Sequence, residues 1–402
     1  MKMNQPIWTK SFISVSVTNF MVFVAFYTLL TTLPLYVLKD LGGTEAQGGL
    51  IVTSILVAAI LVRPFSGRLL ELVGKRKGLI LSVILFTVTM FFYIWVKEFV
   101  PLLILRFFHG LSFGIATTAA GAIAADVVPN ERRGEGLGYF AMSMNIAVVV
   151  GPFTGLTLLQ WFSFELLFML LSVIMLAGIV CSLLVTVPTS AEAKSNIIAK
   201  KLTIHDLFEF RAFPIALISS LVAMAYSSII SFISVYADSI DLAAAASYFF
   251  LVFAAVMIAS RPFLGRLFDV KGAKYVILPC LAVFAIGLIL LGFTTSAWML
   301  LVAAGIIGLG YGSLLPSFQT MAIQSAPPHR SGHATATFFT FYDTGIAIGS
   351  YVLGLVVTFF GFQMLYIVCS VMVIGIFLLF NWQQLQQNRQ KKALDNPMNK
   401  PL

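Results

Sequence analysis

The chain has 402 residues, of which 59% are hydrophobic and 10% are charged, and its formal net charge is +9. A soluble domain carries about 25% charged residues, so this composition, with a mean hydropathy of +0.98, excludes a water-soluble protein. The basic residues form short clusters between apolar runs, which is typical of membrane topology determinants and not of a nucleic-acid-binding surface. We expect the partners to be the lipid bilayer, protons and a small-molecule substrate, with no nucleic acid.

Apolar runs of about 20 residues, the length that a helix needs to cross a bilayer, follow one another along the chain. Each run is predicted to be a helix because lipid offers no partner for unpaired backbone groups. The sequence therefore predicts an all-α integral membrane protein of 12 transmembrane helices. The predicted spans are residues 12–37, 46–66, 78–96, 101–124, 136–160, 165–187, 212–237, 243–264, 273–293, 297–321, 332–358 and 362–382.

The positions of the basic residues predict the orientation. Of the 25 Lys and Arg residues, only Lys39 and Lys97 fall in loops on the side opposite the termini, and Arg106 falls inside a span. The positive-inside rule then places both termini in the cytoplasm, and we expect a multi-pass protein of the cytoplasmic membrane. The predicted domains are an N-terminal six-helix bundle at 1–187, a cytoplasmic linker at 188–211, a C-terminal six-helix bundle at 212–382 and a cytoplasmic tail at 383–402.

The two predicted bundles are related by an internal repeat. Segment 63–69 recurs at 261–267, with Arg-Pro-Phe and Gly-Arg-Leu in both copies, at an offset of 198 residues. The same offset relates Gly110 to Gly308. Six spans separate the copies, so both halves share one orientation. This is a parallel repeat, an architecture in which the substrate binds between the halves near the middle of the membrane.

Three motifs resemble those of the major facilitator superfamily. The loop that starts at Gly67 is similar to the signature loop of that superfamily, with Glu71 where Asp is usual. The fourth span carries Arg106 and His109, similar to the fourth-helix motif, with His where Gln is common. The fifth span carries a Gly-Pro-x-x-Gly sequence that resembles the antiporter motif of proton-coupled drug exporters. The residues of this helix-packing motif are Gly151, Pro152 and Gly155.

The resemblance implies a role for charged residues at the cytoplasmic surface. In the family such residues form a latch that holds the cytoplasmic side closed while the cavity opens outward. Surface ion pairs are worth only about 0–1 kcal/mol each, so a latch needs a network, and the alternative is a solvated cluster that serves topology alone. The predicted gating residues are Gly67, Arg68, Glu71, Asp126, Arg133, Gly265 and Asp269.

Asp343 is the acid that lies deep in a predicted span, about 18 Å from the start of the eleventh span at 1.5 Å per residue. A charge there costs about 2.5–3.5 kcal/mol, so such residues usually face a cavity or a partner. We interpret Asp343 as the proton carrier; the alternative is a structural acid that bonds Asn145, its repeat counterpart. Arg106 is expected to tune proton coupling or bind an anionic group of the substrate, and the alternative is that it snorkels to the interface.

The remaining residues of interest are the Gly-Pro motif, a set of cavity residues and the three cysteines. The Gly-Pro motif of the fifth span is expected to pack against the eighth span and to limit leakage. By the resemblance, the cavity residues are Tyr27, Asn145, Tyr226, Tyr311, Phe318 and Tyr342, and the aromatic ones suit an amphiphilic solute. The three cysteines lie singly in apolar runs, so we expect no metal site and no cofactor, only the proton gradient as driving force.

We interpret the chain as a monomeric, proton-coupled secondary transporter that exports small amphiphilic or metabolite-like solutes by alternating access. One alternative is a proton-coupled uptake symporter. Another is a non-transporting membrane receptor or an integral membrane enzyme. The sequence holds no Ser/His/Asp set and no phosphate-binding loop, so we expect no enzyme activity.

Overall fold

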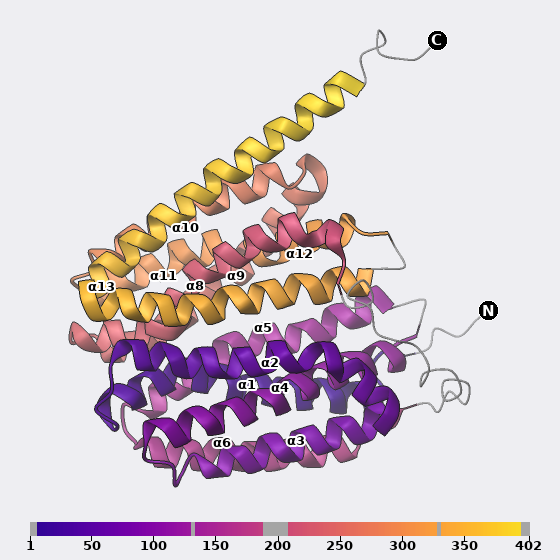
Figure 1. Cartoon of the computed structure of the whole chain (residues 1–402), viewed down its shortest axis with the longest axis vertical. Coiled ribbons are helices and arrows are strands. Elements are labelled where there is room, and N and C mark those ends of the chain that lie inside the picture. Colours follow the sequence, from indigo (N-terminus) through magenta and orange to yellow (C-terminus); the bar gives the residue numbers. More distant parts are fainter. Residues whose placement is uncertain (1–5, 130–132, 188–207, 328–330, 395–402) are drawn as a thin grey trace. The chain divides into compact units, whose positions relative to one another are not determined.

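The computed structural model describes residues 6–129, 133–187, 208–327 and 331–394, and these ranges contain helices joined by short turns and no strand (Figure 1). The first half holds α1 (Lys10–Lys39), α2 (Glu45–Val73), α3 (Lys75–Phe92), α4 (Phe99–Val127), α5 (Arg133–Leu158) and α6 (Phe164–Leu183). The second half begins with the short 3-10 helix η2 (Phe210–Ala212). It continues with α8 (Phe213–Ser239), α9 (Ala243–Lys271), α10 (Lys274–Gly292), α11 (Ala297–Tyr311), α12 (Leu314–Gln324) and α13 (Ser331–Leu394).

Polar caps fix where several helices begin. The side chain of Thr9 accepts a hydrogen bond from the first turn of α1. Thr44 and Gln47 form a capping box at α2, and Ser163 and Ser296 cap α6 and α11 in the same way as Thr9. These side chains satisfy backbone N–H groups that have no partner within the helix. The first residue of each of these helices is therefore determined by the capping residue directly before it.

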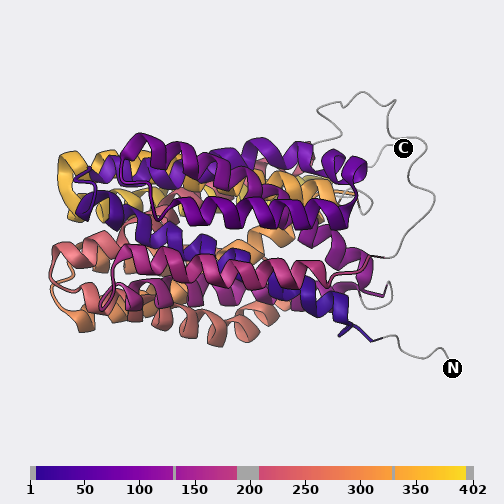
Figure 2. The same ribbon diagram turned by 90° about the horizontal axis from the view of Figure 1, so that it is seen from below.

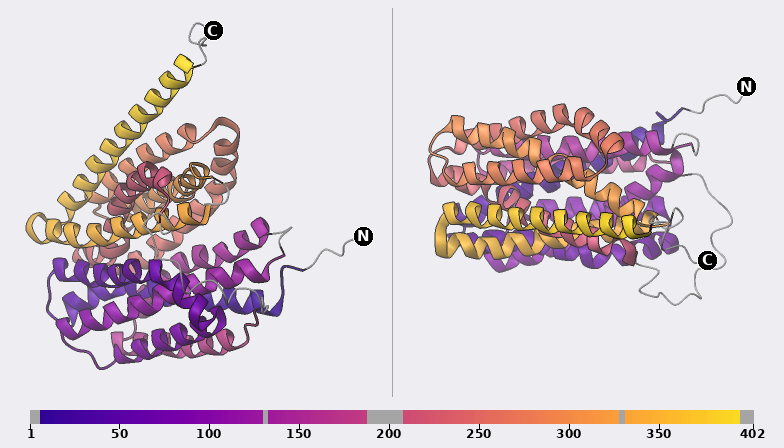
Figure 3. Two further views of the ribbon diagram at one scale, coloured as in Figure 1. Left: turned by 45° about the vertical axis from the view of Figure 1, so that its right-hand side comes forward. Right: turned by 90° about the horizontal axis from the view of Figure 1, so that it is seen from above.

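The predicted all-α membrane fold is confirmed. Within the described residues, nine helical segments are long and apolar enough to cross a membrane. The predicted eleventh and twelfth spans lie together in α13, which reverses direction at Gly361, where φ is 79° (Figure 3). The predicted tenth span is divided into α11 and α12. The structure is thus consistent with the predicted 12 spans.

The chain forms two compact units whose boundaries cut across individual helices. Unit 1 holds the described residues of Met1–Leu207 together with Ile229–Phe250 and Ser350–Thr358. Unit 2 holds Phe208–Ser228, Leu251–Gly349 and the described part of Phe359–Leu402. In unit 1 the helices α1 to α6 run alongside one another (Figure 2), with α1 packed on α5 and α2 packed on α4. The predicted boundaries at residues 187 and 212 stay a prediction.

The internal repeat is visible as matching close contacts inside each unit. A Cβ added at Gly110 of α4 would lie 2.3 Å from the carbonyl oxygen of Ile55 in α2. A Cβ at Gly308 of α11 would lie 2.3 Å from the carbonyl oxygen of Phe253 in α9. Both residues of the second pair lie 198 positions after those of the first. Small residues let membrane helices approach closely, and the two halves use this device at equivalent positions.

Candidate functional site

A cluster of three tyrosines lies inside unit 2. The rings of Tyr226 on α8 and Tyr311 on α11 are stacked, with centroids 3.8 Å apart and an interplanar angle of 7°. The hydroxyls of Tyr311 and Tyr342 share a hydrogen bond of 2.5 Å. Phe253 and Phe284 close the other sides of Tyr311. We name Tyr226, Tyr311 and Tyr342 the tyrosine cluster; three residues predicted to line the cavity therefore lie together.

The tyrosine cluster combines apolar ring surface with hydroxyl groups. Tyr226 and Tyr311 are only 3% and 5% exposed, whereas Tyr342 is half-buried. The ring of Tyr342 also stacks on Phe338, with centroids 6.3 Å apart. Aromatic rings that carry a polar group suit ligands with one apolar and one polar part. Tyr342 is the member of the cluster with the most accessible surface for such a contact.

Asp343 follows Tyr342 on α13 and is 8% exposed. Successive residues of an α-helix project about 100° apart, so Asp343 and Tyr342 occupy different faces of α13. The helix is held tightly at this point: a Cβ at Gly345 would lie 2.0 Å from the carbonyl oxygen of Ser220 in α8. Gly349 approaches the backbone of Met224 in α8 in the same way. The backbone of α13 therefore packs closely on α8 two and six residues after Asp343.

A second polar group is buried in unit 1, around Arg106 of α4. Arg106 and His109 are both 0% exposed. The hydroxyl of Tyr93, at the end of α3, lies 3.0 Å from His109 Nδ1, and the Tyr93 hydroxyl also interacts electrostatically with Arg106. The ring of Phe86 lies against His109 with centroids 4.0 Å apart. We name Tyr93, Arg106 and His109 the arginine cluster.

Unit 1 also contains polar contacts between its first helices and the segments contributed by α8, α9 and α13. Lys39 Nζ lies 2.6 Å from a carboxylate oxygen of Asp238. The hydroxyl of Ser234 donates to the carbonyl oxygen of Thr31 at 2.8 Å. Gln160, in the turn after α5, donates to the hydroxyl of Ser247 at 2.8 Å. Two of these contacts link α1 to α8, and the third links the turn after α5 to α9. The Lys39–Asp238 pair lies at the end of unit 1 that carries the α1–α2 loop.

We predict a small stability effect for the Lys39–Asp238 pair. The side chains are 50% and 32% exposed, and exposed ion pairs contribute about 0.2–1 kcal/mol. Lys39→Met, Asp238→Asn and the double variant should therefore give a coupling energy below about 1 kcal/mol in thermal or denaturant unfolding. A coupling energy above about 2 kcal/mol would show that the pair is shielded from solvent.

Charged loop residues at the same end of unit 1 influence one another. Burial raises the pKa of Asp40, and the positive charges of Lys39 and Lys97 oppose that rise. A hydrogen bond to Glu165 raises the pKa of Lys97, and these two residues form an ion pair. Both partners of that pair are exposed, so the pair contributes little to stability.

Some of the predicted gating residues are described by the structure. Asp126, near the end of α4, accepts from Lys75 Nζ at 2.6 Å, which ties α4 to the start of α3. A Cβ at Gly67 or Gly265 would meet nothing within 4 Å, so neither position requires glycine for space. Gly74, which ends α2, has a φ of 93°, which favours glycine. The side chains of Arg68, Glu71, Arg133 and Asp269 lie outside the described part of the structure.

The glycines of the predicted packing motif approach α1. A Cβ at Gly151 would lie 2.9 Å from the carbonyl oxygen of Val24, and one at Gly155 would lie 2.6 Å from Thr28 Cγ2. Thr28 also donates to the carbonyl oxygen of Gly151 at 2.9 Å. Pro152 lies inside α5, between them. The partner of these two glycines is therefore α1. The ring of Phe153, which lies between them, contacts Tyr248 of the predicted eighth span with centroids 6.3 Å apart, and the expected role in limiting leakage stays a prediction.

Two of the remaining predicted cavity residues, Tyr27 and Phe318, form other aromatic contacts. Tyr27 belongs to α1 in unit 1, where its ring stacks on Phe23. Phe318 of α12 is 1% exposed, and its ring packs edge-on against Phe380. The side chain of Asn145 lies outside the described residues. Phe318 is thus placed as a core residue of unit 2.

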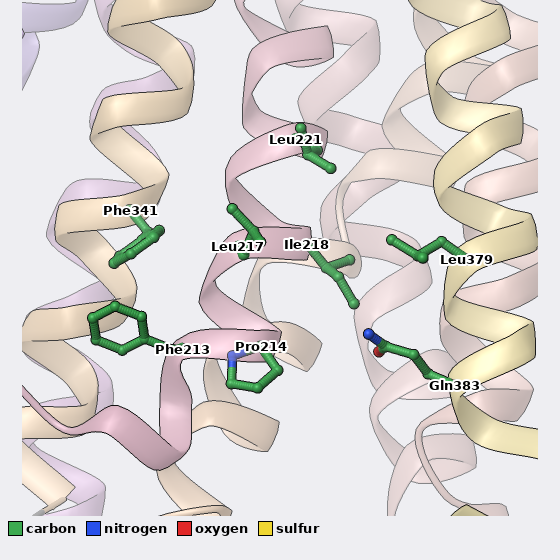
Figure 4. A pocket seen from close by; sticks show the side chains of 8 residues that line it. All are labelled: Phe213, Pro214, Leu217, Ile218, Leu221, Phe341, Leu379 and Gln383. Atoms are coloured by element: carbon green, nitrogen blue, oxygen red, sulfur yellow. The ribbon is translucent and has the colours of Figure 1, made fainter. Parts of the chain in front are cut away.

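An apolar groove of about 370 Å³ lies in unit 2 between α8 and α13 (Figure 4). None of the tyrosine cluster lines it, and its surface is almost entirely hydrocarbon, so it lacks the polar groups that orient a solute. The residues that line the groove are Phe213, Pro214, Leu217, Ile218, Leu221, Phe341, Leu379 and Gln383. We therefore place the candidate site at the tyrosine cluster and Asp343.

The apolar helices, the internal repeat and the buried polar groups define a multi-pass membrane protein with polar side chains inside its helix bundles. The family model of the Major Facilitator Superfamily matches residues 15–343 and 252–397. The chain belongs to this superfamily. It is a secondary transporter and not an enzyme.

Two curated relatives illustrate the similarity. An uncharacterized MFS-type transporter of Methanocaldococcus jannaschii is 25% identical over 347 residues, which are 84% of this chain and 89% of that protein. The quinolone resistance protein NorA of Staphylococcus aureus is 30% identical over 136 residues. That match covers 34% of this chain and about a third (35%) of NorA.

Solved structures share the fold at low sequence identity. A bacterial homolog of the human lysosomal transporter Spinster, in an inward-facing and unoccupied conformation, has a TM-score of 0.76 at 13% identity. The alignment covers 94% of this chain and 97% of that chain. The nucleoside transporter NupG has a TM-score of 0.71 at 14% identity, covering 92% of this chain and 98% of that chain.

Sequence reasoning missed two buried polar features of the chain. It gave no role to His109 or Tyr93, although the i, i+3 spacing of Arg106 and His109 places them on one face of a helix. It also missed the serines of α8, of which Ser231 bonds Ser350 at 2.9 Å. The sequence did contain a sign of these serines: Ser recurs at helical spacing within the apolar run that forms α8, and this spacing indicates a polar stripe along one face of the helix.

Proposed function

We propose that this transporter is a proton-coupled exporter of small amphiphilic solutes, lipophilic cations among them, and that it works by alternating access. The observation that carries the proposal is a carboxyl group, Asp343, that is 8% exposed in a membrane-spanning helix beside a residue of the tyrosine cluster. A carboxyl in that position is costly as an anion. It is therefore suited to carry a proton when the cavity is wet and to be neutral when occluded.

The proposed cycle uses a difference between two states. Asp343 takes a proton on the outer side and releases it on the cytoplasmic side, and solute and proton occupy the site alternately. A gradient drives net transport only when each ligand stabilises the two states differently. In this proposal the protein is a monomer of the cytoplasmic membrane, with both termini in the cytoplasm and no cofactor. The predicted gating residues stabilise the outward-open state.

The similarity to part of NorA supports export, because that relative is named for quinolone resistance. An aromatic site with one nearby acid suits a cationic amphiphile. Uptake by symport remains the competing function on the same fold, and fold alone does not decide between them.

The test measures the direction of flux. Cells that carry the transporter are loaded with ethidium while de-energised and are then re-energised, with empty-vector cells as the control. We expect faster ethidium efflux in the transporter cells and loss of the difference on adding a protonophore. Net uptake that depends on the proton gradient would favour the symporter and contradict export.

A further inference from the structure

The guanidinium of Arg106 is buried with fewer hydrogen-bond acceptors around it than it has N–H donors. All three of its nitrogens are buried, and the side chain with which they interact among the described residues is that of Tyr93, through its hydroxyl. A guanidinium carries five N–H donors and cannot lose its proton in a protein. The hydroxyl of Tyr93 accepts from one N–H, so most of the five donors have no acceptor among the described residues. A buried group in this condition requires an explanation.

His109 adds a further unpaired atom to the same site. Its Nε2 is buried and has no partner among the described residues, while Nδ1 lies 3.0 Å from the hydroxyl of Tyr93. Because Arg106 only donates, the hydroxyl oxygen of Tyr93 faces it best as an acceptor, and the hydroxyl proton then goes to Nδ1. In that arrangement Nε2 carries the hydrogen and is a donor. The unsatisfied groups of the arginine cluster are then all donors, beside a positive charge.

No carboxylate compensates this charge within the described part of unit 1. The acids there lie in loops or within two residues of a helix end. Glu98 precedes the first turn of α4 and is exposed, and the eight residues from it to Arg106 span about 12 Å. Asp126, at the other end of α4, is bonded to Lys75. A buried cation without a counter-charge is unfavourable by several kcal/mol.

We propose that Arg106 and His109 bind a small monovalent anion, with the guanidinium as the charged donor and Nε2 as a second donor. Aromatic rings pack against the cluster: the ring centroid of Phe86 lies 4.0 Å from that of His109, and that of Phe168 lies 5.6 Å from that of Tyr93. We take a halide and formate as the small anions to test. Guanidinium donors bind carboxylates through paired hydrogen bonds. This proposal is independent of the transport function proposed above, because its test measures anion binding and not transport.

The test is the melting temperature of the purified full-length transporter in detergent, at constant ionic strength. Sodium isethionate, whose anion is larger than chloride or formate, is replaced stepwise by sodium chloride or by sodium formate. A ligand that binds only the folded state raises the melting temperature with concentration as the site fills. We expect a saturable rise of about a few °C in the parent, and loss of that rise in Arg106→Gln. Arg211→Gln, which changes an exposed arginine, is the matched control and should behave like the parent.

The salts identify the source of the anion. A rise with chloride alone identifies an inorganic ion, and an equal or larger rise with formate identifies a carboxylate. If Arg106→Gln does not fold, Tyr93→Phe replaces it as the variant. Loss of the hydroxyl that orients His109 should raise the apparent Kd severalfold. A parent that melts at the same temperature in all three salts overturns the proposal, as does an unchanged rise in Arg106→Gln.

Discussion

Replacing Asp343 by Asn should abolish uphill transport while the protein still folds and binds solute. Asn keeps the shape and most of the polarity of the side chain but cannot carry a proton. Each pH unit is worth about 1.4 kcal/mol per proton, or a tenfold concentration ratio. With a gradient of about 2 pH units and one proton per cycle, the parent sustains a solute ratio of up to about 100-fold. The variant should equilibrate solute at a ratio near 1. Accumulation of ethidium in reconstituted vesicles measures the ratio.

The control for this prediction is Asp241→Asn. Asp241 lies in the turn after α8 with φ of 58°, a conformation that Asn also adopts, and the substitution removes the same charge outside the membrane. It should transport like the parent. A steady-state ratio in Asp343→Asn equal to that of the parent would show that Asp343 is structural and that coupling resides elsewhere.

Replacing Gly110 or Gly308 by Ala should strongly destabilise the fold. The added Cβ at either position lies 2.3 Å from a carbonyl oxygen of the neighbouring helix, which is far inside van der Waals contact. Backbone cannot move aside as a flexible side chain can, so α4 must separate from α2, or α11 from α9. Overpacking of this kind costs about 1–3 kcal/mol. We expect a lower melting temperature and a lower yield of folded protein in both variants.

Matched glycines on the same helices separate this clash from a change in helix propensity. A Cβ at Gly121 of α4 would meet nothing within 4 Å, and one at Gly305 of α11 would make ordinary contacts at 3.7 Å. Alanine is favoured over glycine in a helix by up to about 1 kcal/mol, so Gly121→Ala and Gly305→Ala should be neutral or stabilising. Equal melting temperatures for Gly110→Ala and Gly121→Ala would contradict the close packing of α2 and α4.

Much of the fold followed from the sequence because the membrane restricts the possible solutions. Backbone groups in lipid must be satisfied within a helix, so long apolar runs predicted the helices directly. The offset of 198 residues predicted equivalent packing, and Gly110 on Ile55 and Gly308 on Phe253 confirm it. Three of the six residues predicted to line the cavity, Tyr226, Tyr311 and Tyr342, lie together in the structure, and their role in substrate binding stays a prediction.

The direction in which side chains point was harder to predict. In a membrane bundle both the lipid-facing and the core-facing sides of a helix are apolar, so hydrophobic periodicity does not separate them. This is why the sequence did not show that Gly151 approaches α1 while Phe153 of the same helix contacts Tyr248 of the predicted eighth span. The contact of Tyr93 with His109 joins two helices, and no spacing within one helix predicts it. Such contacts depend on how helices rotate against each other.

The most direct test of coupled export is proton movement caused by solute movement. The purified transporter is reconstituted in vesicles that contain a pH-sensitive dye, with equal pH on both sides and the membrane potential clamped by potassium and valinomycin. Ethidium is then added outside, and protein-free vesicles correct for passive entry. The account predicts that ethidium entry through the transporter drives protons out, so the lumen becomes alkaline, and that Asp343→Asn removes this change. Acidification of the lumen would show symport, and ethidium entry without any pH change would contradict proton coupling.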